Sequence, residues 1–368
     1  MIIKIEIQLK VTSKKYVMKV HAPRLPVIDA FKAIASQLIV LHHLAAYGPI
    51  SDAVQQAAPG LISWLYDYAR MAVQVFFVIG GYLAAQVMFS KIRDTHAFAT
   101  LIFNRYLRLA IPFVVAVTFS IACAIVARQW IVDDFVPDAP TFPQLLAHLL
   151  MLQSVLDFDA LLAGAWFIAI DFQLFILMLV IVWLGGKTAY AKNVVLMLTT
   201  LMVAASLFWF NRDVSLDDWA PYFFGAYGMG ATAYWASKPE KSGILWLGFI
   251  VLLTIIALVI AFRARIMIAL SVTIILFLTT NMQQIKTSAW QALPRYLGKI
   301  SYSLFLVHFP ILLLINAGFA GMGFKSAIAG GIAMLIIWAA SLLMAYIFYR
   351  TVEKPAEKML KSRSKLKI

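Results

Sequence analysis

Cysteine and charge are both scarce in this chain, and each scarcity excludes a class of protein. The single cysteine, Cys123, excludes an internal disulfide framework and a metal cluster held by thiolates. Only 13% of the 368 residues are charged, whereas 63% are hydrophobic, and the mean hydropathy is +0.87. A soluble domain could not bury this much apolar surface. The composition therefore predicts an all-α, polytopic protein whose solvent is the lipid bilayer.

Long apolar segments recur along the whole chain. A helix that crosses a bilayer needs about 20 mostly apolar residues. Ten segments meet this requirement, or eight if the seventh and eighth do not form two full crossings. The ten segments lie near 26–46, 70–89, 107–127, 164–184, 193–210, 219–236, 243–262, 266–280, 298–317 and 327–349.

Basic residues outnumber acidic ones by 31 to 17, which gives a formal net charge of +14. Nucleic-acid binding would explain this excess, but so would basic loops gathered on one side of a membrane. A cytoplasmic N-terminus puts 25 of the 31 basic residues on the inner side and ten of the 17 acids in outer loops. The positive-inside rule therefore predicts both termini inside and no nucleic-acid partner, with Arg263 and Arg265 as one local conflict.

The domain boundaries follow from the same distribution. Residues 1–23 lack the long apolar run of a signal peptide and are expected to be a cytoplasmic extension. Residues 24–350 form the predicted ten-helix membrane domain, and residues 351–368 a basic cytoplasmic tail. The longest stretch between predicted helices, 128–163, carries a weak amphipathic pattern that suits a segment lying along the outer interface.

Ionisable residues interrupt the first apolar segment. Asp29, Lys32, Ser36, Val40 and His43 follow one another at intervals of three or four residues, so they share one face of a helix. Such groups are costly where they face lipid. They are therefore expected to face the interior of the bundle or a water-filled path.

Five short blocks occur in a fixed order along the chain. They are Lys32 to His43 preceded by Asp29, VFFVIGGYL from Val75, RYLR at 105–108, AWFIAIDFQLF at 165–175 and LGKISYSLFLVHFP at 297–310. Together they resemble the membrane-bound acyltransferase 3 family, which acylates cell-surface carbohydrates and related acceptors. The chain departs from the family pattern at Gly80 (usually serine), Asp171 (usually glutamate) and Phe175 (usually tyrosine).

The resemblance and the chemistry of acyl transfer indicate the same base. Transfer from a thioester to a hydroxyl needs a group that takes the hydroxyl proton, and an imidazole can take and return it near neutral pH. His43 is the predicted base, with a hydrogen-bonded core histidine as the alternative, and the neighbouring His42 is interpreted as structural. Asp171 is predicted at a similar depth, where its carboxylate would orient His43. The alternative roles of Asp171 are a structural ion pair with Lys32 and a polar anchor unrelated to His43.

The resemblance implies an acyl-CoA donor that binds from the cytoplasmic side, with no metal and no bound cofactor. Arg105 and Arg108 lie on adjacent turns and suit bidentate binding of phosphate, although basic residues at a helix start also set topology. Paired glycines suit either close helix packing or a thin ligand between helices. The predicted donor-binding residues are Lys32, Arg105, Arg108, Gly80, Gly81 and Tyr82.

Other candidate site residues have less specific signals. His308 comes shortly before Pro310, which frees a backbone carbonyl and so favours a polar interior site. The sequence leaves two roles open for His308, namely substrate binding and stabilisation of the helix bundle. The full set of these candidates is Asp29, Trp166, Ser301, Tyr302 and His308.

The sequence thus predicts a bacterial inner-membrane O-acyltransferase. We expect it to move an acyl group, acetyl above all, from cytoplasmic acyl-CoA to a hydroxyl of a cell-surface glycan or its lipid-linked precursor. The glycan acceptor would reach the outer mouth directly, or a separate outer-face acyl-transfer protein would complete the transfer. A multi-pass transporter of an envelope precursor or small solute is the alternative, because intramembrane charges also mark transport paths. A non-catalytic assembly protein of an envelope pathway is the third hypothesis.

Overall fold

The computed structural model describes residues 25–88, 95–188, 190–239, 241–281 and 291–366. Every regular element among these residues is a helix, so the predicted all-α class is confirmed. The predicted extension at 1–23 lies outside the described residues. The long helices are α1 (Pro26–Ala46), α4 (Val73–Met88), α5 (Thr95–Ala127), α7 (Ala165–Gly186), α8 (Ala191–Phe208), α9 (Ala220–Ala236), α10 (Lys241–Ile260), α11 (Ala264–Asn281), α12 (Ala292–Gly321) and α13 (Ala327–Phe348). The shorter ones are α2 (Gly48–Gln55), α3 (Pro59–Tyr68), α6 (Phe142–Leu149) and α14 (Lys354–Leu366).

All ten predicted segments coincide with helices. Eight helical runs among the described residues are long and apolar enough to cross a membrane. The two segments predicted near 219–236 and 266–280 correspond to shorter helices, because α9 has 17 residues and the apolar part of α11 is Ala264–Thr280. The chain is a multi-pass membrane protein, whereas ten crossings and cytoplasmic termini stay predictions.

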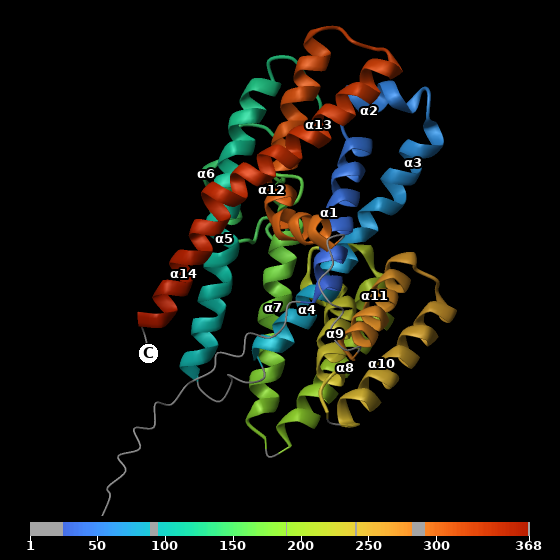
Figure 1. The fold of residues 1–368 in the computed structure, drawn as a ribbon, viewed down its shortest axis with the longest axis vertical. Helices are drawn as coiled ribbons and strands as arrows, with labels where there is room; N and C mark the ends of the chain where they lie inside the picture. Colours follow the sequence, from blue (N-terminus) through green and yellow to red (C-terminus); the bar gives the residue numbers. More distant parts are fainter. Residues whose placement is uncertain (1–24, 89–94, 189, 240, 282–290, 367–368) are drawn as a thin grey trace, which may run out of the picture.

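The helices form two groups, which Figure 1 shows at the top and at the lower right of the view. In the first group α1 packs along α12, and α12 also contacts α5 and α13. In the second group α8, α10 and α11 pack around α9. The groups are linked because α4 contacts both α1 and α9, while α7 contacts α4, α5 and α9.

Glycines let α4 and α9 approach each other backbone to backbone. A Cβ added to Gly81 would lie 1.8 Å from the carbonyl oxygen of Tyr227, and one added to Gly230 would lie 1.9 Å from the carbonyl oxygen of Val78. Small residues at such crossings allow the close packing that holds helices together in lipid, where the hydrophobic effect does not act between them. Together with α7, α8, α10 and α11, this contact with α4 buries α9 around almost its whole circumference.

The described end of the chain is helical as well. A five-residue π-helical turn, Tyr349–Glu353, joins α13 to α14. α14 then lies beside α5, as Figure 1 shows at the left of the view. The segment predicted as a basic tail therefore brings two carboxylates, on Glu353 and Glu357, to the arginines of α5.

The stretch 128–163 contains the short helix α6, which begins with a capping box between Thr141 and Gln144. His148 ties this helix to the following loop, because its Nδ1 donates to the carbonyl oxygen of Gln144 at 2.9 Å and its Nε2 accepts from the backbone N–H of Leu161 at 3.0 Å. Burial lowers the pKa of His148, which favours the neutral ring that both bonds require.

Arg263 and Arg265, the basic residues in conflict with the topology rule, have a structural role at the end of α8. Arg263 donates to the carbonyl oxygen of Leu207 at 2.9 Å and to the side-chain oxygen of Asn211 at 2.8 Å. Arg265 donates to the backbone oxygen of Asn211 at 3.2 Å. These bonds satisfy carbonyl groups that a helix C-terminus leaves without partners.

Candidate active site

Two neighbouring cavities contain most of the residues that the sequence singled out. We call the first the arginine cavity; its volume is about 340 Å³. The second, the histidine cavity, has a volume of about 500 Å³. The polar residues of the arginine cavity include Lys32, Arg105, Arg108, Asp171, Lys299, Ser301, Tyr302, Glu353 and Glu357. The histidine cavity is lined by His42, His43, Tyr47, Arg70, Asp134, Phe135, Trp166, Phe305 and Phe309 among others.

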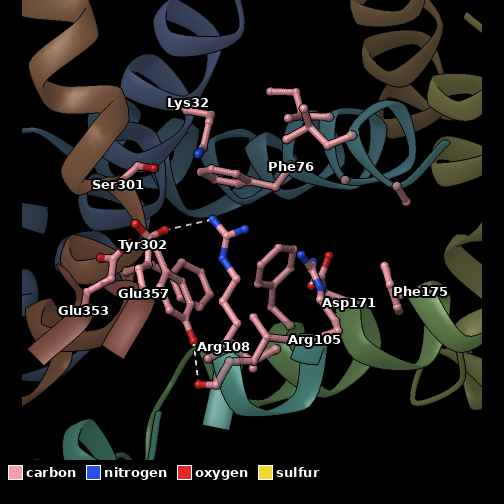
Figure 2. A pocket seen from close by; sticks show the side chains of 18 of the residues that line it. Lys32, Phe76, Arg105, Arg108, Asp171, Phe175, Ser301, Tyr302, Glu353 and Glu357 are labelled. Carbon is pink, nitrogen blue, oxygen red and sulfur yellow. Dashed lines mark hydrogen bonds and ion pairs between the residues drawn. The ribbon is translucent and has the colours of Figure 1, made fainter. Parts of the chain in front are cut away.

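Arg105 and Asp171 form an ion pair in the arginine cavity. The Arg105 guanidinium donates to the Asp171 carboxylate, and the two side chains are 24% and 9% exposed. The Phe175 ring covers the guanidinium carbon at 5.2 Å, within reach of a cation–π interaction. Figure 2 shows the pair and this ring together on one side of the cavity.

The predicted contact between Asp171 and His43 is wrong. Asp171 lines the arginine cavity and binds Arg105, whereas His43 lines the histidine cavity. The reason is that Arg105 is not at a helix start, because α5 begins at Thr95, about 15 Å earlier along the helix, and the Arg105 side chain is largely buried against α7. There it needs a counter-ion, and Asp171 supplies one.

A second set of polar contacts lies at the other side of the arginine cavity. Arg108 donates to Glu357 at 3.0 Å, and Ser303 donates to Glu353. Figure 2 shows Arg108 reaching toward Glu357, with Lys32 extending from α1 toward the same space. The Arg108 side chain is 61% exposed, so this guanidinium is accessible to a ligand. The cavity wall carries four cations and three carboxylates, which leaves an excess of positive charge.

His43, which lines the histidine cavity, forms a buried pair with His308, which lines neither cavity. Nδ1 of His43 lies 2.6 Å from Nε2 of His308, and the two rings are nearly parallel at 3°. Nδ1 of His308 lies 3.0 Å from the carbonyl oxygen of Leu304, one turn back along α12. A carbonyl oxygen only accepts, so Nδ1 of His308 carries a proton, and Nε2 of the neutral ring is an acceptor.

The network also assigns the proton on His43. Because Nε2 of His308 accepts, Nδ1 of His43 is the donor, and the lone pair of the neutral His43 ring lies on Nε2. A ring held at Nδ1–H with Nε2 unprotonated is the arrangement that a general base needs. His42 is oriented differently: its Nδ1 donates to the carbonyl oxygen of Leu65 at 3.3 Å, so its ring is fixed against α3.

Of the glycines and tyrosine predicted to bind the donor, one lines the arginine cavity and the other two lie in contacts between helices. Gly80 lies in the arginine cavity, where an added Cβ would be 3.2 Å from Asp171 Oδ1. Gly81 instead forms the α4–α9 contact, and Tyr82 bonds Thr280 with its hydroxyl at 3.0 Å. Neither Gly81 nor Tyr82 lines either of these two cavities, and the contacts of both are with neighbouring helices.

The remaining candidates lie in or near the two cavities. Ser301 and Tyr302 line the arginine cavity, where the Tyr302 hydroxyl donates to the carbonyl oxygen of Leu109 at 3.0 Å. Trp166 lines the histidine cavity. Asp29 is buried where α1 crosses α12, next to Gly298, and lines neither cavity.

Sequence reasoning missed several residues of both cavities. Glu353 and Glu357 were assigned to the basic tail, although their four-residue spacing places them on one helix face. Phe305 lies within the block at 297–310, but no signal in the sequence distinguished it from its neighbours. Among the described residues, no group of three or more histidine, cysteine, aspartate or glutamate side chains could hold a metal ion.

The protein has apolar helices that can span a membrane, a cavity lined by cations and a buried pair of histidines. These features are those of a multi-pass membrane protein with polar sites inside the helix bundle. Residues 25–350 match the family model described as an acyltransferase domain. This match covers most of the chain, which therefore belongs to the acyltransferase 3 family and is a membrane acyltransferase. Comparisons with curated proteins and with solved structures gave no match.

Proposed function

We propose that the protein is an O-acyltransferase of the bacterial inner membrane that takes an acyl group, acetyl first of all, from cytoplasmic acyl-CoA. The acceptor in this proposal is a hydroxyl of a cell-surface glycan or its lipid-linked precursor, reached directly or through a separate outer-face acyl-transfer protein. The observation that carries the proposal is the His43–His308 pair, which leaves a buried imidazole nitrogen unprotonated at a cavity that shares one wall residue, Phe305, with a cation-lined cavity.

The arginine cavity suits the nucleotide end of the donor. Arg108 and Lys299 present positive charge at its wall, and guanidinium groups bind phosphate oxygens through paired hydrogen bonds. Lys32 and His43 lie on one helix, eleven residues apart, which corresponds to a rise of about 16 Å. An extended pantetheine arm can cover such a distance, so phosphates near Lys32 allow a thioester near His43.

The chemical step assigned to His43 is proton transfer. Nε2 takes the proton of the acceptor hydroxyl as its oxygen attacks the thioester carbonyl carbon. The carbon–sulfur bond then breaks, the acyl group stays on the oxygen, and the leaving thiolate takes the proton from the imidazolium. His308 supports the step because its Nε2 accepts from Nδ1 of His43 while the imidazolium exists.

The lining of the histidine cavity suits a sugar. Tyr47, Phe135 and Trp166 offer flat aromatic faces, and Asp134 and Arg70 add polar groups next to them. Specific small-molecule sites commonly combine such apolar walls with a few polar groups that fix orientation. This lining supports a polyhydroxylated acceptor over a purely apolar one.

The test uses inside-out membrane vesicles that contain the protein and enclose the envelope fraction of the host as acceptor, with radiolabelled acetyl-CoA added outside. His43→Ala should lower label transfer about 10²- to 10⁴-fold, the usual contribution of a general base. His42→Ala is the matched control, because its ring is fixed against α3, and it should lose far less. Equal transfer by wild type and His43→Ala would contradict the proposal. Uptake of a solute without consumption of acetyl-CoA would support a transporter instead.

A further inference from the structure

Phe305 belongs to the walls of both cavities. Among the described residues it is the one side chain that lines the arginine cavity and the histidine cavity alike. It lies on α12, one turn before His308, with the two ring centres 6.2 Å apart. The ring is 5% exposed, so it is almost completely enclosed by the protein.

The neighbours of Phe305 come from the start of α7. Its ring centre lies 5.0 Å from that of Phe167, at an interplanar angle of 60°. A Cβ added to Gly164 would lie only 2.4 Å from a ring carbon of Phe305, so the absence of a side chain at Gly164 makes room for the ring. Phe167 lines the arginine cavity, whereas Gly164 lines the histidine cavity. At this place one aromatic ring closes the wall between the two cavities.

We propose that Phe305 is the specificity-determining residue for the acyl chain. This inference rests on the proposed function, in which the donor occupies the arginine cavity and His43 acts in the histidine cavity. The thioester carbonyl must then come close to His43, and the acyl chain beyond it must fit around the Phe305 ring. A short chain fits beside the ring, and a longer chain collides with it.

The effect of this wall on selectivity should be large. Enzymes with closed apolar walls discriminate between chains that differ by one methylene by about 10- to 200-fold. Replacing the phenyl ring with a methyl group removes the wall where the cavities meet. Phe305→Ala should therefore raise the ratio of the hexanoyl-CoA to the acetyl-CoA rate constant kcat/KM by at least about tenfold, and Phe305→Leu should raise it less.

The experiment measures His43-dependent CoA release from acetyl-, butyryl- and hexanoyl-CoA in the vesicles described above. Phe319→Ala is the matched control, because Phe319 is a buried phenylalanine on the same helix, α12, that lines neither cavity. Its selectivity ratio should equal that of wild type. Thermal unfolding of each variant identifies losses due to misfolding, and Phe305→Leu keeps the test decisive if Phe305→Ala does not fold.

Two outcomes would overturn the inference. One is a wild-type protein that uses hexanoyl-CoA as well as acetyl-CoA; the other is an unchanged selectivity ratio in folded Phe305 variants. Failure of the proposed function would appear differently, as wild-type CoA release that His43→Ala does not reduce with any acyl-CoA.

Discussion

The hydrogen bond between His43 and His308 predicts that His308 acts through His43. Replacing His308 with alanine removes the acceptor of the Nδ1–H group and leaves this donor buried, since His43 is 7% exposed. The His43 ring is then free to rotate or to take the other tautomer, in which Nε2 carries the proton and cannot act as a base.

The magnitude follows from the cost of an unsatisfied buried donor. Such a group costs about 1–3 kcal/mol, and the higher end applies when the donor is charged, as in the imidazolium. Because about 1.4 kcal/mol corresponds to a factor of ten, His308→Ala should lower kcat about 5- to 150-fold. His308→Gln should be less impaired, because its side-chain oxygen can accept from Nδ1 of His43.

The assay is CoA release from acetyl-CoA at saturating donor, with kcat and KM measured separately and thermal unfolding followed in parallel. The informative variant combines His43→Ala with His308→Ala. Residues that act as a unit are strongly non-additive, so the double variant should be hardly slower than His43→Ala alone.

Two results would refute this reasoning. Full activity of a folded His308→Ala variant would show that the base needs no partner on Nδ1. Losses that multiply in the double variant would show that His308 acts separately, as a substrate contact or as a packing residue of α12.

The other predictions concern the arginine cavity and the helix crossing beside it. Asp171→Asn should destabilise the protein by about 3–5 kcal/mol in thermal unfolding, because it leaves a largely buried guanidinium unpaired, and the double variant with Arg105→Met should recover part of this loss. Glu357→Gln frees its exposed arginine partner, so the KM for acyl-CoA should fall by up to about fivefold with an unchanged unfolding temperature. Gly81→Ala should prevent accumulation of folded protein in membranes, because its Cβ would meet backbone at 1.8 Å, whereas Gly60→Ala, with open space around it, should accumulate normally.

The fold was predictable because lipid imposes a simple rule on the sequence. Backbone groups in a bilayer must bond within the segment, so apolar runs of sufficient length are helices. Each predicted segment is indeed helical. The errors are at the ends: α5 begins at Thr95 rather than near 107, and α12 extends over Ala292–Gly321. These additions are polar or weakly apolar turns that continue beyond the apolar run, where hydropathy gives no signal.

The contacts between site residues could not be predicted from the depth of each residue along its helix. Asp171 and His43 were assigned similar depths by counting residues from the outer helix ends, which assumes that those ends lie at one level. Figure 1 shows α7 beginning well below the end of α1, so the assumption fails. His308 lies 265 positions from His43, and only the packing of α1 along α12 brings the two rings together.

The positions of the charged residues explain why the hydrogen-bond partner of His43 is a neutral histidine rather than a carboxylate. If Asp171 turned to His43, the Arg105 guanidinium would be left largely buried without a counter-ion, which costs several kcal/mol. His308 accepts the same hydrogen bond without adding a charge. A neutral acceptor stabilises an imidazolium less than a carboxylate does, so in the proposed mechanism His43 returns its proton to the leaving thiolate more readily. The Arg105–Asp171 ion pair thus remains in the arginine cavity, and the proposed proton transfer starts from two neutral rings at the histidine pair beyond Phe305.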